Sequence, residues 1–166
     1  MVPMTDDVQW RDVTPDYFDA VPAAGGVAVR MGSHLASTLH DHADRLVRVL
    51  ESGDERTLVW MFPDAYATPA DSAEFRLRHA ARLRDSAAPR RVRDQLAAAP
   101  HHVLSPPEVH DWIETFALAR FVDPPRRRWW RRSRGKLDLS SLWFNHVQDS
   151  LVLASSPELL HHDLRL

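Results

Sequence analysis

Apolar residues recur at intervals of three and four along most of this chain of 166 residues, and this periodicity limits its fold more than any other feature. Because a helix turns once every ~3.6 residues, such spacing gathers the apolar side chains on one face. The first periodic segment, 33–52, begins at Ser33, a capping residue, and stops at Gly53. Its buried face is predicted to hold Leu35, Leu39, Ala43, Leu46 and Leu50.

A second helix is predicted to follow an aromatic linker at 58–66. Asp71 and Glu74 stand three residues apart, as in a capping box, and would open this helix. A proline inside a helix removes a hydrogen bond, so Pro89 is expected to kink or divide it near Ala88. The predicted buried stripe consists of Leu77, Ala81, Ala88, Val92 and Leu96.

Two more helices are predicted in the second half of the chain. The run Ser105-Pro106-Pro107-Glu108 combines a cap, a proline in the first turn and an acid at the third position, which is a strong helix start. Its expected buried residues are Val109, Trp112, Ile113, Phe116 and Ala117. For the last helix, 139–154, they are Leu139, Leu142, Trp143, Val147, Leu151 and Ala154.

The fold class that follows is mainly α, a compact bundle of four or five helices. A short two-stranded ribbon is the one β element that the pattern allows, formed by 27–31 after Gly25-Gly26 and by 101–104. The predicted organisation is an irregular acidic segment at 1–26, a helical domain at 27–155 that carries a basic arm at 124–137, and a tail at 156–166.

Composition excludes several kinds of chemistry and of location. The chain has no cysteine, which excludes disulfides, thiol redox switches and sulfur-ligated metal sites. The first residues are acidic and interrupted by Pro3, unlike a signal peptide, and no run of apolar residues is long enough to span a membrane. We therefore expect a cytoplasmic protein.

The basic arm is the strongest local signal of binding. Seven cations lie between Arg126 and Lys136 without an intervening acid, and such a run repels itself and stays out of a core. Nucleic-acid phosphates, anionic lipid headgroups or an acidic protein surface would each suit it, and a solvated loop is the alternative without function. The candidate partner-binding residues are Arg126, Arg127, Arg128, Trp129, Trp130, Arg131, Arg132, Arg134 and Lys136.

Other candidate sites have weaker signals. Arginines between Arg76 and Arg93 either extend the basic surface or form a solvated helix face. His34, His40 and His42 cluster with two aspartates, but they do not share one face, so we expect no metal and no cofactor. Glu108, His110, Asp111 and Glu114 could form an acid–base pair, yet catalytic motifs are absent and we expect no enzyme.

One element resembles a known family. The run Met61-Phe62-Pro63-Asp64-Ala65-Tyr66, followed by Glu74-Phe75-Arg76, is similar to an element of an actinobacterial domain-of-unknown-function family that includes the oxidative-stress regulator AosR. The similarity extends over about 27–154 and includes Trp143 and Asp149 on the last helix. The matching residues that we expect to be structural are Phe62, Pro63, Asp64, Tyr66, Glu74, Phe75, Trp143 and Asp149.

The resemblance implies a helical, non-enzymatic regulator that contacts the transcription machinery, with a sigma factor or RNA polymerase as partner. Redox sensing by a cysteine pair does not carry over, because the chain has no cysteine. We expect a regulatory or adaptor protein. The first alternative is a direct nucleic-acid-binding protein, and the second is a small enzyme or a metal-binding protein. Exposed tryptophans would also suit a homo-oligomer.

Overall fold

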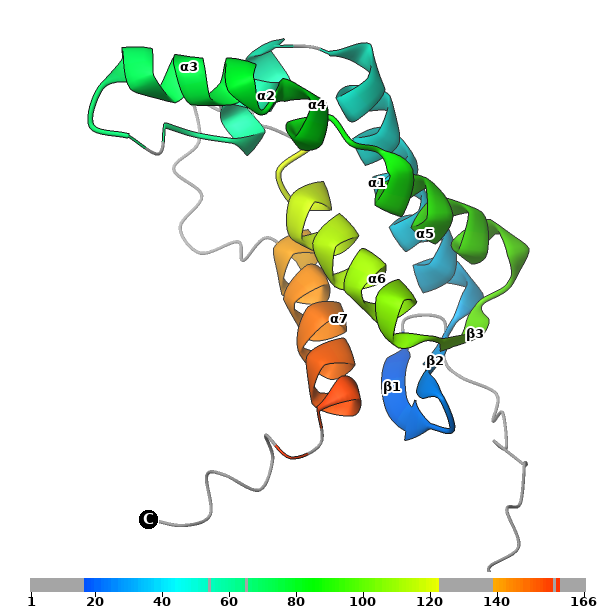
Figure 1. Ribbon diagram of the computed structural model, residues 1–166. Helices are drawn as coiled ribbons and strands as arrows, with labels where there is room; N and C mark the ends of the chain where they lie inside the picture. The colour runs from blue at the N-terminus through cyan, green and yellow to red at the C-terminus, as the bar shows by residue number, and fades with distance from the viewer. Residues whose placement is uncertain (1–16, 54, 65, 123–138, 157, 159–166) are drawn as a thin grey trace, which may run out of the picture.

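The chain folds into seven helices and a three-stranded sheet, seen in a computed structural model that describes residues 17–53, 55–64, 66–122, 139–156 and 158 (Figure 1). The basic arm at 124–137 lies outside these residues. The elements are β1 (Phe18–Ala23), β2 (Gly26–Met31), α1 (Ser33–Ser52), α2 (Glu55–Met61), α3 (Pro69–Arg78), α4 (Ala80–Leu83), α5 (Ala87–Ala98), β3 (His101–Leu104), α6 (Pro106–Ala119) and α7 (Leu139–Ser155).

The sheet is antiparallel with strand order β1-β2-β3. Val27 pairs with Leu104, and Arg30 pairs with His101, which confirms the predicted pairing of 27–31 with 101–104. The third strand, β1, lies within the segment predicted to be irregular, and that prediction is wrong for Phe18–Ala23. A two-residue turn joins β1 to β2, and Gly25 supplies the positive φ of 84° that this turn requires.

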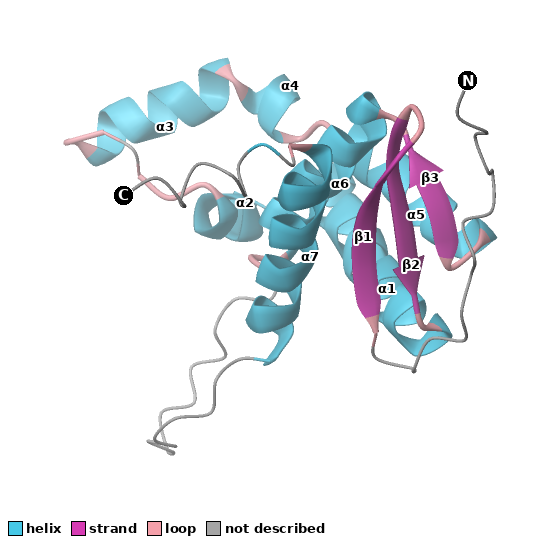
Figure 2. Ribbon diagram, turned by 90° about the horizontal axis from the view of Figure 1, so that it is seen from below, coloured by secondary structure: helices cyan, strands magenta, loops and turns pink. Residues whose placement is uncertain are grey.

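The buried side chains of the described residues form one hydrophobic core. It is built by the sheet and the four long helices α1, α5, α6 and α7, whose arrangement Figure 2 shows. Helix α1 packs against α5 and α6, while α7 packs against α6 and β1. The largest fully buried side chains come from α6, β2 and α1, and include Trp112, Phe116, Met31, Leu39 and Leu46. The amphipathic periodicity of α1 and α6 therefore serves its usual purpose, which is to bury one face of each helix.

Hydrogen bonds at the start of α6 join this helix to α5. Ser105 is the N-cap of α6, as predicted, and it forms a capping box with Glu108, whose Oε2 accepts from the Ser105 hydroxyl over 2.6 Å. The other oxygen, Glu108 Oε1, accepts from Gln95 of α5, whose own Oε1 accepts from Trp112 Nε1 at 2.7 Å. The polar edge of a buried indole is thereby satisfied.

The helix boundaries depart from the predictions at several points. Gly32, not Ser33, is the N-cap of α1, although α1 ends at Gly53 as predicted. The expected linker at 58–66 is helical through Met61. The expected second helix is three helices, and Thr68 caps α3 by accepting from the Asp71 backbone N–H. Pro89 lies in the first turn of α5, where a proline removes no helical hydrogen bond.

Candidate functional site

Helices α2, α3 and α4 form a projection, residues 55–84, which we call the α2–α4 lobe (Figure 1). Leu58 and Met61 of α2 are buried and attach the lobe to the core. The outermost helix, α3, buries only Ser72. A helix with so little burial needs other contacts to hold its place.

The residues of the resembling element supply those contacts. Arg76 of α3 donates to Asp64 Oδ1 over 2.7 Å and to the Phe62 carbonyl over 3.5 Å. The rings of Tyr66 and Phe75 lie 5.5 Å apart, and the Tyr66 backbone N–H donates to the Ser72 hydroxyl. Asp64, which was expected to be structural, thus binds the guanidinium of an α3 residue twelve positions along the chain. These contacts fix the end of α2 against α3.

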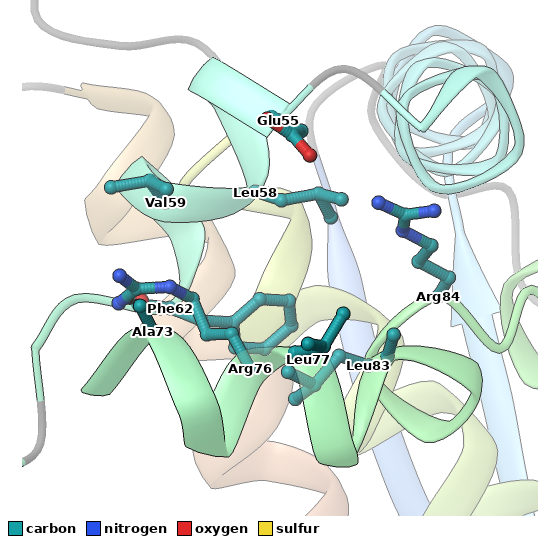
Figure 3. Close-up of a pocket in the computed structure, with 10 residues that line it drawn as sticks. Glu55, Leu58, Val59, Phe62, Ala73, Arg76, Leu77, Leu83 and Arg84 are labelled. Atoms are coloured by element: carbon teal, nitrogen blue, oxygen red, sulfur yellow. Dashed lines mark hydrogen bonds between the residues drawn. The ribbon is translucent and has the colours of Figure 1, made fainter. Parts of the chain in front are cut away.

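The lobe encloses an apolar groove with a volume of about 350 Å³ between α2, α3 and α4 (Figure 3). Leu58, Phe62 and Leu83 are among its apolar lining residues, and Glu55, Arg76 and Arg84 are its charged ones. A second cavity of about 390 Å³ lies beside the first, and Phe62, Arg76 and Leu83 line both. Cavities of this size and character accept apolar side chains or small ligands.

Large apolar side chains stand exposed on the same lobe. Leu77 is 79% exposed, Tyr66 51%, Val59 47% and Trp60 43%. The periodic pattern predicted Leu77 as buried, and that prediction is wrong because Leu77 lies at the open edge of the groove. Exposed apolar side chains gathered in one region are typical of an interaction surface.

The predicted basic face between Arg76 and Arg93 is largely neutralised by ion pairs. Arg90 pairs with Glu51 and lowers the pKa of that carboxyl group through a hydrogen bond. A hydrogen bond from Arg91 to Asp111 raises the pKa of the guanidinium. Arg76 pairs with Asp64, Arg78 with Glu74, and Arg93 with both Asp94 and Asp44. The face is therefore a set of local charge pairs, not a continuous basic surface.

The other candidate sites from the sequence have structural explanations. Glu108 is held in the capping box, where a hydrogen bond from the Ser105 hydroxyl lowers its pKa. Asp111 pairs with Arg91, and His110 lies 3.9 Å from Glu114 on the surface. Within the described part of the chain, no three His, Cys, Asp or Glu side chains lie close enough together to hold a metal ion.

Two of the residues shared with the resembling family lie away from the lobe. Trp143 is half-buried on α7, with its ring 5.8 Å from that of His146, and Asp149 is exposed on the same helix. Helix α7 packs against α6 and β1. The structure therefore brings Phe62, Pro63, Asp64, Tyr66, Glu74 and Phe75 together on the lobe and leaves the other two apart.

Comparison with known proteins shows the family of the chain. A family model described as a domain of unknown function, DUF2017, matches residues 15–155. No curated protein and no solved structure matches the chain. In the described residues, none of the helices has the length and apolar character needed to cross a membrane.

Proposed function

The chain belongs to the DUF2017 family, whose description assigns no activity, and we propose that it is a non-enzymatic adaptor that binds a protein partner through the α2–α4 lobe. The observation that carries this proposal is the set of large exposed apolar side chains around an apolar groove. A partner that covered them would remove apolar surface from water. This burial contributes about 25 cal/mol per Å², which works against the entropy lost on association.

The way in which α3 is held favours binding to a preformed surface. Arg76 donates hydrogen bonds to both Asp64 and the Phe62 carbonyl, and Tyr66 packs on Phe75. These contacts form the groove in the absence of a partner. A groove that is already ordered loses less conformational entropy on binding than one that must be assembled.

The partner that we propose is a component of the transcription machinery, a sigma factor or RNA polymerase itself. This part of the proposal rests on the resemblance to the family of AosR. A partner of this kind implies that the protein works in the cytoplasm. Sensing by cysteine oxidation is not part of the proposed mechanism, since the chain has no cysteine.

The test measures binding of the immobilised full chain to purified RNA polymerase core enzyme and, separately, to purified sigma factors from the same organism. Leu77→Asp places a charge at the edge of the groove, and we expect it to weaken binding at least tenfold. Val103→Asp is the matched control, because Val103 is also an exposed apolar residue but lies on β3. Equal weakening by both variants, or by neither, would contradict the lobe as the binding surface.

The same experiment includes duplex and single-stranded DNA, which tests the alternative of direct nucleic-acid binding. A third variant changes Arg126, Arg127, Arg128, Arg131, Arg132 and Arg134 to serine. DNA binding that depends on these arginines and not on Leu77, together with no binding to polymerase or sigma factor, would replace the adaptor proposal.

A further inference from the structure

Helix α7 has apolar residues on all sides, but only one side is covered. Phe144, Val147, Leu151 and Ala154 are buried against α6 and the sheet. On the opposite side, Leu142 is 46% and Leu153 39% exposed. Leu142 was predicted to be buried, and that prediction is wrong. The outer side of α7 therefore carries two leucines that no other element covers among the described residues.

Four residues form a continuous line on that outer side. Leu142, His146, Asp149 and Leu153 follow one another at intervals of four, three and four, which is the spacing of one helical face, and we call them the α7 stripe. All four side chains are exposed. At ~1.5 Å per residue the stripe is about 16 Å long, with an apolar residue at each end and two polar residues between.

The two polar residues of the stripe have unused capacity for interaction. Nε2 of His146 lies 3.3 Å from the Phe18 carbonyl, which can only accept, and its other ring nitrogen has no hydrogen-bond partner in the described part of the chain. In the protonated imidazole this second nitrogen donates as well and can bind a carboxylate. Asp149 has no ion pair or hydrogen bond there. An exposed aspartate between two leucines favours a partner that offers apolar contacts at the ends and a donor in the middle.

A second copy of the same stripe meets these requirements when it runs antiparallel. Leu142 then faces the second copy's Leu153, and His146 faces the second copy's Asp149. Both pairings have the same midpoint, between Val147 and Gln148, so one two-fold axis satisfies all four contacts. A parallel arrangement would instead place Asp149 against Asp149, which like charges disfavour.

We propose that the α7 stripe is a homodimer interface in which two α7 helices pack antiparallel across a two-fold axis. Such an interface is self-complementary, which is the commonest symmetry among soluble oligomers. The stripe lies on α7 and the groove on α2–α4, so a dimer presents two grooves. The inference does not depend on the proposed function, because it uses no residue of the lobe.

The first test is the mass of the full chain in solution, by sedimentation equilibrium over a range of concentrations. We expect a concentration-dependent dimer that Leu153→Asp converts to a monomer and that Asp149→Arg weakens at least tenfold. Leu77→Asp, on the lobe, is the control and should leave the dimer intact. Circular dichroism checks that each variant is folded. A wild-type monomer at all concentrations would overturn the proposal, and so would a dimer that Leu153→Asp leaves unchanged.

The second test reads the register of the two helices. The chain has no cysteine, so single-cysteine variants give unambiguous cross-links. A mixture of Leu142→Cys and Leu153→Cys chains should form a disulfide between the two variants under mild oxidation. Either variant alone should form little, because the two identical positions lie about 16 Å apart along the antiparallel helices. Efficient cross-linking of Leu142→Cys with itself would overturn the antiparallel arrangement.

Discussion

The body of the molecule and the α2–α4 lobe contain similar kinds of residues, yet they use them differently. In the body, Trp112 and Phe116 are fully buried, and the indole nitrogen of Trp112 has its acceptor. On the lobe, Trp60 and Leu77 are exposed, and an ion pair between Arg76 and Asp64 holds the outer helix. The difference indicates that burial determines the fold in one region, while the other keeps its apolar surface available.

The largest expected difference between the regions comes from the same substitution made in each. Trp112→Ala should lower the free energy of unfolding by about 3–5 kcal/mol, because it leaves a cavity and removes the partner of Gln95. Trp60→Ala should lower it by less than about 1 kcal/mol, since Trp60 is already 43% exposed. Urea unfolding followed by far-UV circular dichroism measures both. Similar losses would mean that the lobe belongs to the cooperative core.

A smaller effect in the body is expected from Gly26→Ala. A Cβ atom on Gly26 would lie 1.8 Å from the Leu104 carbonyl oxygen, so β2 and β3 would have to separate. We expect a loss of about 2–3 kcal/mol in the free energy of unfolding. Gly25→Ala is the control, because it meets nothing within 4 Å and only its positive φ opposes a side chain. If Gly26→Ala were the milder change, the close approach of the strands would not limit stability.

Glu108→Gln should cost about 1 kcal/mol at neutral pH by weakening the capping box. It should also reduce the dependence of stability on pH. Because the pKa of Glu108 is lowered from 4.5 in the folded protein, its contribution is complete above about pH 4.5 and is lost as the pH falls through the folded pKa. Urea unfolding at several pH values between 3 and 7 should therefore show a steeper acid decline for the wild type than for the variant. Parallel curves would contradict this.

The smallest effect on global stability is expected on the lobe. Asp64→Asn breaks the ion pair with Arg76, whose side chain is 21% exposed, and should change the free energy of unfolding by less than about 1 kcal/mol. Hydrogen exchange of the α3 amides should nevertheless quicken, since that pair holds α3 in place. Glu74→Gln, which removes the surface pair with Arg78 on the same helix, should leave exchange nearly unchanged. Equal exchange rates of the α3 amides in the two variants would contradict the claim that Asp64 holds α3 in place.

Local signals made parts of the fold predictable from the sequence. The periodicity of α1 with Gly53 after it and the helix start at Ser105 follow from neighbouring residues. The pairing of β2 with β3 joins two short segments far apart in the sequence, each of which could be recognised as a strand by itself. Strand β1 was missed because Pro22 and Asp19 are unusual in strands and because its partner fixes it more than its own sequence does. Helix α2 was missed because Pro63 and the aromatic run resembled a linker.

The candidate site was predictable only in part. The resembling element pointed to Phe62, Asp64, Tyr66 and Phe75, and the structure brings them together on the lobe. The pairing of Asp64 with Arg76 joins residues twelve positions apart, which no periodic pattern reveals. Periodicity also cannot distinguish a face that is covered from one that is not, and for this reason Leu77 and Leu142 were both assigned to the core. The basic arm remains a prediction.

The end of α1 and the start of α5 lie side by side. Glu51 accepts hydrogen bonds from Ser86 at 3.0 Å and from Arg90 at 2.6 Å, so the chain leaves the body and returns to it at nearly the same point. The lobe is in effect a closed insertion between two adjacent helices. Insertions whose ends meet can change in length and sequence while the rest of the fold persists. In a family built in this way, the lobe can change and bind different partners while the body of the molecule keeps the same fold.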